Sequence, residues 1–332
     1  MELDFKRLPK VELHLHLDCS LSFEVVQQID PNISESVYQN EFIAPVGCTG
    51  LSDYIERASR GINLMQTKDN LRLVTLDLFR QLKEDNVIYA EIRFAPLLHL
   101  KEGLTATEVV KAVNLASEEG IKKYGVEASI ILCTLRHYSE EQSMETIKLA
   151  EAFRDTLVRG FDIAADEAGY PVDNHIAAFQ YAKKKNIPCT AHAGEAKGAS
   201  SVWETLKYFG PSRIGHGVRC AEDPQLLKYI RKHNIHLEVC PTSNVLTKIF
   251  QKIEDHNIDH LFDEQISLSI NTDGRAISNV SLEDEYEKLN RVFHWEMNHF
   301  KKCNIEALQH AFLPEQKKKK LLSVLLKRFK DS

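Results

Sequence analysis

Val11-Glu12-Leu13-His14-Leu15-His16-Leu17-Asp18 is the stretch of this 332-residue chain that says most about its fold. Successive side chains of a β-strand point to opposite faces, so as a strand it places His14, His16 and Asp18 on one face and the leucines on the other. Two imidazoles about 7 Å apart along a strand can both reach one metal ion. The alternative interpretation is a pair of histidines on the solvent face of an amphipathic strand, and the stretch alone leaves both open.

Three further polar clusters occur far downstream. They are Thr190-Ala191-His192-Ala193-Gly194-Glu195, Arg213-Ile214-Gly215-His216-Gly217 and Ser269-Ile270-Asn271-Thr272-Asp273-Gly274. Each cluster ends a short apolar run, where a buried strand would emerge into a loop. Four polar clusters at the predicted carboxyl ends of strands indicate one convergent site.

Strands and helices are predicted to alternate along the chain. Residues 105–123 show a helical pattern, with a capping box from Thr105 to Glu108 and then a core stripe of valines. Alternation of this kind predicts βαβ units and a parallel sheet. We count eight β-rich apolar runs, which predicts a (β/α)₈ TIM barrel with its active site at the carboxyl ends of the strands. The runs are 11–17, 87–95, 126–133, 158–164, 188–193, 213–216, 235–240 and 266–272.

The chain is longer than a minimal barrel, which takes about 250 residues. The extra length lies mainly between the first and second predicted strands, in residues 20–86. This stretch is predicted to form a helical insertion with a loop around Pro45-Val46-Gly47, long enough to cover the mouth of the barrel. We expect residues 1–332 to form a single barrel domain.

Composition excludes several classes of protein. The net charge of −6, with acids and bases interspersed, argues against a nucleic-acid surface. The run Lys317-Lys318-Lys319-Lys320 is interpreted as a solvated helix face, because leucines follow it. We find no signal peptide and no apolar run of membrane-spanning length. The seven cysteines never form a CxxC pair, which predicts a reduced cytoplasmic protein without a thiolate metal site.

Zinc is the cofactor that the histidines predict. His14, His16 and His192 supply three neutral nitrogen ligands, and Asp273 supplies an oxygen. Such a set with one open position suits a single catalytic Zn²⁺, which lowers the pKa of its bound water to about 7.

Glu195 and His216 are the predicted partners of the zinc in catalysis. A carboxylic acid beside a dry pocket can have its pKa raised, so Glu195 is a candidate general acid. His216 is placed to orient or to deprotonate the water. Taken alone, Glu195 is equally a surface or capping carboxylate and His216 a hydrogen-bonded barrel histidine. Their order on successive strands favours the catalytic interpretation.

These residues resemble the adenosine deaminase family of the amidohydrolase superfamily, also called the adenosine/AMP deaminase family. The resemblance implies a zinc-dependent barrel that hydrolyses the 6-amino group of adenosine, and of 2′-deoxyadenosine, to give inosine or deoxyinosine and ammonia in purine salvage. It covers nearly the whole chain. The matching motifs are residues 9–18 (PKVELHLHLD), 162–167 (DIAADE), 192–195 (HAGE), 213–217 (RIGHG), 238–244 (EVCPTSN) and 271–273 (NTD).

The same resemblance implies a role for each site residue. His14, His16, His192 and Asp273 bind zinc, Glu195 protonates the purine N1, and His216 with Asp273 handles the attacking water. Asp18 hydrogen-bonds the ribose, and the backbone near Ala165 approaches the purine edge. The implied substrate-binding positions are His16, Asp18, Ala165 and Gly274, and the implied partner is a small purine nucleoside, with no nucleic acid or membrane.

Two positions depart from the family pattern. Ala165 stands where glycine is common, so a methyl group faces the purine or the barrel. Gly274 stands where a second carboxylate commonly contacts the purine N7. N7 then has to find water, a backbone group, Arg275 or Asn271. A further interpretation is that Gly274 serves a tight turn with positive φ.

Several alternatives remain open. Residues 161–167 contain no lysine of the kind that bridges two metals in related hydrolases, and the signature of cytidine-type zinc deaminases is absent. Adenine deaminases share most of these motifs but commonly carry glutamate in place of Asp18. A deaminase of another 6-aminopurine nucleoside also fits. A non-catalytic purine-binding barrel would be favoured by the loss of a ligand or of Glu195, and neither is lost.

Overall fold

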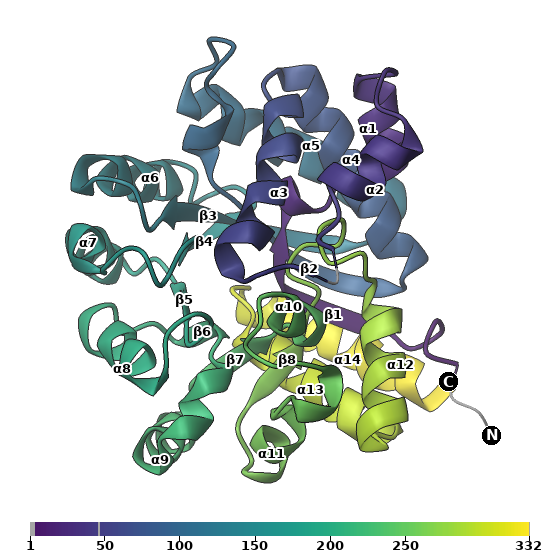
Figure 1. Cartoon of the computed structure of the whole chain (residues 1–332), viewed down its shortest axis with the longest axis vertical. Coiled ribbons are helices and arrows are strands. Elements are labelled where there is room, and N and C mark those ends of the chain that lie inside the picture. The colour runs from purple at the N-terminus through teal and green to yellow at the C-terminus, as the bar shows by residue number, and fades with distance from the viewer. Residues whose placement is uncertain (1–3, 46, 332) are drawn as a thin grey trace.

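The computed structural model describes residues 4–45 and 47–331 and contains a ring of parallel strands inside a layer of helices (Figure 1). The strands pair in chain order in two four-stranded sheets, β1-β2-β3-β4 and β5-β6-β7-β8. Their bounds are β1 Lys10–His16, β2 Val87–Phe94, β3 Glu127–Leu135, β4 Val158–Ala164, β5 Thr190–Ala193, β6 Arg213–His216, β7 His236–Val239 and β8 Leu268–Ile270. Each of these strands overlaps one of the eight predicted runs.

Backbone hydrogen bonds join the two sheets at both seams. Between β4 and β5, the amide of Phe161 donates to the carbonyl of Pro188 at 3.0 Å. Between β1 and the segment after β8, the amide of His16 donates to Asp273 at 2.8 Å, and the amide of Asp273 donates to His14 at 2.9 Å. The strands therefore close into the predicted (β/α)₈ barrel.

The barrel interior contains charged side chains as well as apolar ones. Arg213 and Glu238 are fully buried, and their Nε and Oε1 atoms lie 2.8 Å apart. The second carboxylate partner of Arg213 is Glu91, at 2.6 Å. Buried charges persist only where they are paired, so each of these side chains needs its partner.

Helices that follow the strands along the chain form the outer layer (Figure 1). The predicted helix at 105–123 is α5, Ala106–Tyr124, and its capping box between Thr105 and Glu108 is confirmed. Further helices are α6 Glu140–Ala152, α7 Ile176–Lys185, α8 Ala199–Tyr208, α9 Pro224–His233, α10 Pro241–Leu246, α11 Ile258–Asp263, α12 Leu282–Phe293, α13 Met297–His310 and α14 Glu315–Asp331. The predicted solvated lysine run lies in α14, where Lys319 and Lys320 are exposed and Leu321 and Leu325 are buried.

The predicted helical insertion between the first two strands is also confirmed. It contains α1 Phe23–Ile29, α2 Glu35–Glu41, α3 Leu51–Leu64 and α4 Lys68–Glu84, which lie near one another in Figure 1. Of these helices, α4 packs against α5 and β2 as a regular barrel helix, and α3 packs against the turn that follows β1. Val46, in the predicted loop, lies outside the described residues.

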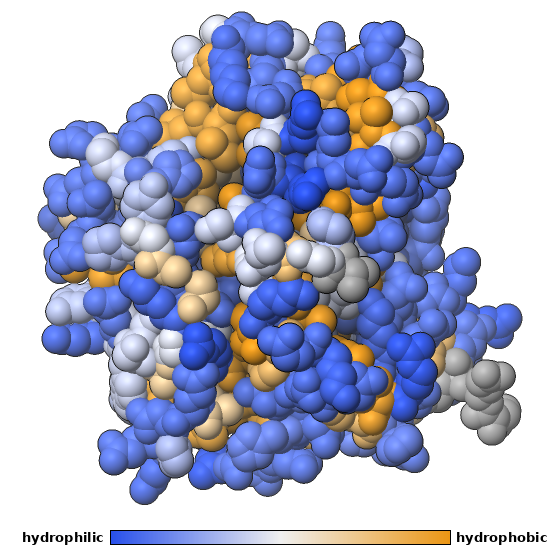
Figure 2. All heavy atoms as spheres, viewed as in Figure 1, coloured by the Kyte–Doolittle hydropathy of each residue, from blue (hydrophilic) through white to orange (hydrophobic). Residues whose placement is uncertain are grey.

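The viewed surface is mostly hydrophilic (Figure 2), and the cysteines are unpaired. Figure 2 shows mostly hydrophilic residues on the viewed face, with hydrophobic ones visible chiefly among the upper helices. Within residues 4–45 and 47–331, no helix combines the length and the apolarity needed to cross a membrane. All seven cysteines are free, and the five buried ones are Cys48, Cys133, Cys220, Cys240 and Cys303.

Candidate metal and catalytic site

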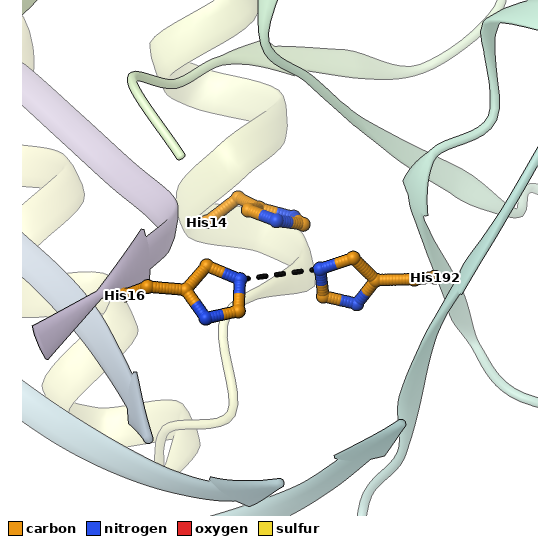
Figure 3. A group of neighbouring side chains, drawn as sticks. All are labelled: His14, His16 and His192. Carbon is orange, nitrogen blue, oxygen red and sulfur yellow. Dashed lines mark hydrogen bonds between the residues drawn. The ribbon is translucent and has the colours of Figure 1, made fainter. Parts of the chain in front are cut away.

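Three histidines meet at the carboxyl ends of the strands (Figure 3). His14 and His16 come from β1, His192 comes from β5, and one ring nitrogen of each lies within 4.8 Å of the others. The Nε2 atoms of His16 and His192 are 3.2 Å apart. Among the described residues, the buried Nε2 of His14 has no hydrogen-bond partner. Ring nitrogens of the three histidines therefore converge, and one of them has no hydrogen-bond partner. This arrangement leaves room for a cation between them.

The structure changes the interpretation of the first strand in two respects. His14 is fully buried, so the alternative of a solvent-facing pair is wrong. Asp18 does not continue the strand, because β1 ends at His16 and Leu17–Cys19 forms a 3-10 turn. This turn still directs Asp18 toward the site, and its Oδ1 lies 4.0 Å from Nδ1 of His16.

Buried carboxylates orient two of the imidazoles. Nδ1 of His14 lies 2.9 Å from Oε2 of Glu238, and Nδ1 of His192 lies 3.1 Å from Oδ2 of Asp162. Arg93 donates to both carboxylates at 2.7 Å. A carboxylate on Nδ1 fixes the ring and its tautomer, so Nε2 is left free to bind a metal.

The pKa shifts favour the same protonation states. Burial lowers the pKa of His192, and burial lowers the pKa of His16 well below its ordinary value. Burial raises the pKa of Glu238, but Arg93 and Arg213 outweigh it and hold that pKa well below its usual range. Neutral imidazoles beside ionised carboxylates are the forms that a metal site requires.

Sequence reasoning assigned no role to Asp162, Glu238 or Arg93. The signal was present, since each is a charged residue within a mostly apolar run, at 158–164, 235–240 and 87–95 respectively. A fully buried charge implies a partner. What the sequence could not show is which partner each one meets.

Asp273 completes the donor set. Its Oδ1 lies 3.6 Å from Nε2 of His14 and 3.5 Å from Nε2 of His16, and its Oδ2 accepts a hydrogen bond from Ser243 at 2.6 Å. Three imidazole nitrogens and one carboxylate oxygen match the ligand types of a catalytic metal centre that keeps an open position. The residues present therefore fit a single metal ion.

Glu195 and His216 lie next to this donor set. Glu195 is 4% exposed, and its Oε2 lies 3.5 Å from Nε2 of His216. Burial, and then the charges of Asp273 and Glu167, raise the pKa of Glu195 well above that of an ordinary glutamate. Burial, and then His14, lower the pKa of His216 well below 6.5. Both shifts favour a protonated carboxyl group beside a neutral imidazole.

Glu167 holds the turn that carries Glu195, a role the sequence reasoning missed. Its carboxylate is fully buried and also accepts a hydrogen bond from Ser201. It accepts from four successive backbone amides, those of Gly194 at 2.8 Å, Glu195 at 2.9 Å, Ala196 at 2.5 Å and Lys197 at 3.0 Å. Glu167 therefore fixes the backbone position of Glu195.

Three non-glycine residues at strand ends have left-handed backbone. They are Ala165 at φ 75°, His216 at φ 58° and Asp273 at φ 65°. Such backbone is unfavourable for residues with a Cβ and is concentrated at functional sites. Glycine would adopt this conformation at position 165 without the steric cost, which gives a physical reason for the family preference there.

Gly274 is explained by packing and not by a turn. Among the described residues the positive φ falls on Asp273, so the tight-turn interpretation of Gly274 is wrong. A Cβ at this position would lie 2.7 Å from the Cβ of Cys19 and 3.2 Å from the hydroxyl of Tyr54. The close approach of these two side chains therefore requires glycine.

The two side chains suggested as N7 partners are engaged elsewhere. Arg275 binds Glu12 at 2.6 Å and Asp85 at 2.9 Å. Asn271 accepts from the amide of Leu13 at 2.8 Å and donates to the carbonyl of Val239 at 3.1 Å. Neither Asn271 nor Arg275 lines the cavity described next.

A cavity of about 200 Å³ brings most of the predicted site residues together. Helix α3 supplies a largely apolar part of the lining, and within the described chain the lining contains no lysine or arginine. His14 lies buried behind the lining, and Gly274 is not part of it. The predicted residues that line it are His16, Asp18, Ala165, His192, Glu195, His216 and Asp273.

Comparison with known proteins identifies the family of this chain. The family model described as adenosine deaminase matches residues 9–328. The adenosine deaminase of Clostridium acetobutylicum is 36% identical over 327 residues, which cover 96% of this chain and 97% of that protein.

Two solved structures share the fold. The adenine deaminase of Arthrobacter aurescens superposes with a TM-score of 0.90 at 24% identity, covering 97% of this chain and 99% of that one. An amidohydrolase from Burkholderia ambifaria with bound zinc superposes with a TM-score of 0.90 at 19% identity, covering 99% and 94%. The match to the family along almost the whole chain shows that this protein belongs to the adenosine deaminase family.

Proposed function

We propose that this protein is a zinc-dependent adenosine deaminase. It hydrolyses adenosine, and 2′-deoxyadenosine, to inosine or deoxyinosine and ammonia in cytoplasmic purine salvage, with residues 1–332 acting as one domain. The observation that supports this most is a single cavity in which His16, His192 and Asp273 adjoin Glu195, a buried carboxyl group whose pKa is raised by burial.

His14, His16, His192 and Asp273 would hold the zinc. When bound, zinc supplies the Lewis acidity that activates water at neutral pH. Glu238 keeps the proton of His14 on Nδ1 through its 2.9 Å contact, so Nε2 faces the ion. Asp162 does the same for His192.

Glu195 supplies the proton that the reaction needs. Attack of water at C6 disrupts the aromatic ring and places electron density on N1. A neutral carboxyl group donates to N1 most strongly in the transition state, where stabilisation raises the rate. Burial raises the pKa of Glu195, which favours its protonated form before the reaction begins. Asp273 and His216 hold the attacking water, and the amine leaves as ammonia.

Asp18 and Ala165 are proposed to position the nucleoside. Both line the cavity, together with apolar side chains of α3. Asp18 accepts hydrogen bonds from the ribose, and the backbone amide of Ala165 approaches the purine edge. Gly274 contributes indirectly, because it leaves room for Cys19 and Tyr54.

The test is turnover measured by ultraviolet absorbance with adenosine, deoxyadenosine, adenine and 5′-modified adenosines. We expect adenosine to be deaminated and adenine to be a much poorer substrate, because Asp18 loses its hydroxyl partner. Equal catalytic efficiency for adenine would replace this proposal with an adenine deaminase. Binding of adenosine without any turnover would indicate a non-catalytic purine-binding barrel.

A further inference from the structure

A chain of hydrogen bonds extends behind His216, away from the cavity. The backbone amide of Ile258 donates to Nδ1 of His256 at 3.0 Å. Nε2 of His256 lies 3.2 Å from Oδ1 of Asn244, and Nδ2 of Asn244 lies 3.0 Å from Nδ1 of His216. Asn244 is fully buried and His256 is 3% exposed. Neither of them lines the cavity.

The hydrogen bond from Ile258 determines which ring nitrogen of His256 carries the proton. A backbone N–H group can only donate, so Nδ1 of His256 carries no proton. Burial lowers the pKa of His256 to about 3, and its ring is therefore neutral at pH 7. A neutral histidine with a bare Nδ1 carries its proton on Nε2 and donates it to Oδ1 of Asn244.

The tautomer of His256 determines the orientation of the Asn244 side-chain amide, and that orientation determines the tautomer of His216. Because its oxygen accepts from His256, its NH₂ group must face His216. Nδ1 of His216 is therefore an acceptor, and its ring proton lies on Nε2, the nitrogen 3.5 Å from Glu195. Flipping the amide would set its NH₂ group against the N–H of His256, and a buried donor without a partner costs about 1–3 kcal/mol.

We propose that Asn244 and His256 are positioning residues that hold His216 as the tautomer with its proton on Nε2. His216 then donates a hydrogen bond to the attacking oxygen, and the proton that this oxygen loses passes to the carboxylate of Asp273. This assignment decides between orienting and deprotonating the water, the two roles that the sequence left open for His216. The catalytic meaning rests on the proposed function, whereas the tautomer is a property of the folded chain.

The test is ¹⁵N NMR of the full chain labelled at histidine, with and without zinc, because protonated and bare ring nitrogens have well-separated resonances. His216→Gln identifies its signals. We expect a bare Nδ1 and a protonated Nε2 for His216. In Asn244→Asp the carboxylate accepts from both histidines, so the proton of His216 moves to Nδ1. Turnover should fall roughly 10²–10³-fold, as for loss of one preorganised donor, with zinc content and KM retained.

His256 offers a matched pair of variants. His256→Gln keeps an acceptor for Ile258 and a donor for Asn244, and should keep the tautomer and the rate. His256→Leu fills the space without a donor, so Asn244 is free to turn and His216 becomes a mixture of tautomers with reduced turnover. A wild-type His216 protonated on Nδ1, or identical His216 signals in the Gln and Leu variants, would overturn the proposal. These readouts hold whether or not adenosine proves to be the substrate.

Discussion

Glu238→Gln is expected to weaken metal binding and to destabilise the fold, two effects that can be measured separately. Oε2 of Glu238 accepts from His14 at 2.9 Å and from Arg93 at 2.7 Å. Its Oε1 accepts from Thr190 at 2.9 Å and faces Nε of Arg213 at 2.8 Å. A glutamine offers one oxygen and one NH₂ group. In either orientation its NH₂ group faces two side chains that donated to the carboxylate.

The structure sets the expected magnitudes. Removing one partner of a buried ion pair costs about 3–5 kcal/mol. Arg93 keeps Asp162 and Arg213 keeps Glu91, so we expect the lower end of that range, about 3 kcal/mol. Loss of an outer-shell carboxylate weakens metal affinity roughly 10–100-fold. That ratio corresponds to about 1.4–2.8 kcal/mol in binding free energy.

Glu91→Gln is the matched control. Glu91 is also a fully buried carboxylate of the barrel interior and pairs with Arg213, but it accepts from Tyr89 and from the amide of Phe312 instead of from an imidazole. Urea denaturation of the metal-free proteins should show similar losses of stability for both variants. Competition with a chelator should show weaker zinc binding only in Glu238→Gln. Equal zinc affinities in the two variants would refute the role of Glu238 in orienting His14.

Four further outcomes are expected. Glu195→Gln should retain zinc and lose roughly 10²–10⁴ in turnover, since an amide cannot protonate N1, and near-native turnover would remove Glu195 from the acid role. Glu167→Gln should lower kcat with little change in zinc content, because one oxygen cannot serve four amides; unchanged kcat would contradict its positioning of Glu195. Ala165→Gly should raise the free energy of unfolding by about 1 kcal/mol, since glycine relieves the left-handed strain, and a lower urea midpoint would argue against that strain. Burial lowers the pKa of His99 to about 4, so its unfolded form binds more protons and stability falls as the pH drops from about 6.5 toward 4. His99→Gln should reduce that dependence by up to about 1.4 kcal/mol per pH unit, and an unchanged slope in urea denaturation would exclude His99 as the cause.

Much of the fold was predictable from local pattern. Apolar runs of strand length alternating with helical stripes are properties of neighbouring residues, and they located all eight strands and helix α5. The polar groups at the ends of those runs had to converge once the barrel was inferred, because parallel strands end at one face. His16, His192, Glu195, His216 and Asp273 accordingly line one cavity.

The tertiary structure decided what the local pattern could not. Glu238 meets His14 across 224 positions of the chain, and Asn244 meets His216 from a different element, so no spacing rule pairs them. Gly274 is required by side chains that arrive from the turn after β1 and from α3. By itself, the sequence predicted which residues are candidates for the chemistry and at which end of the barrel they lie. Only packing decided how each is held, because the orientation and protonation of a buried polar group depend on partners brought close by the fold.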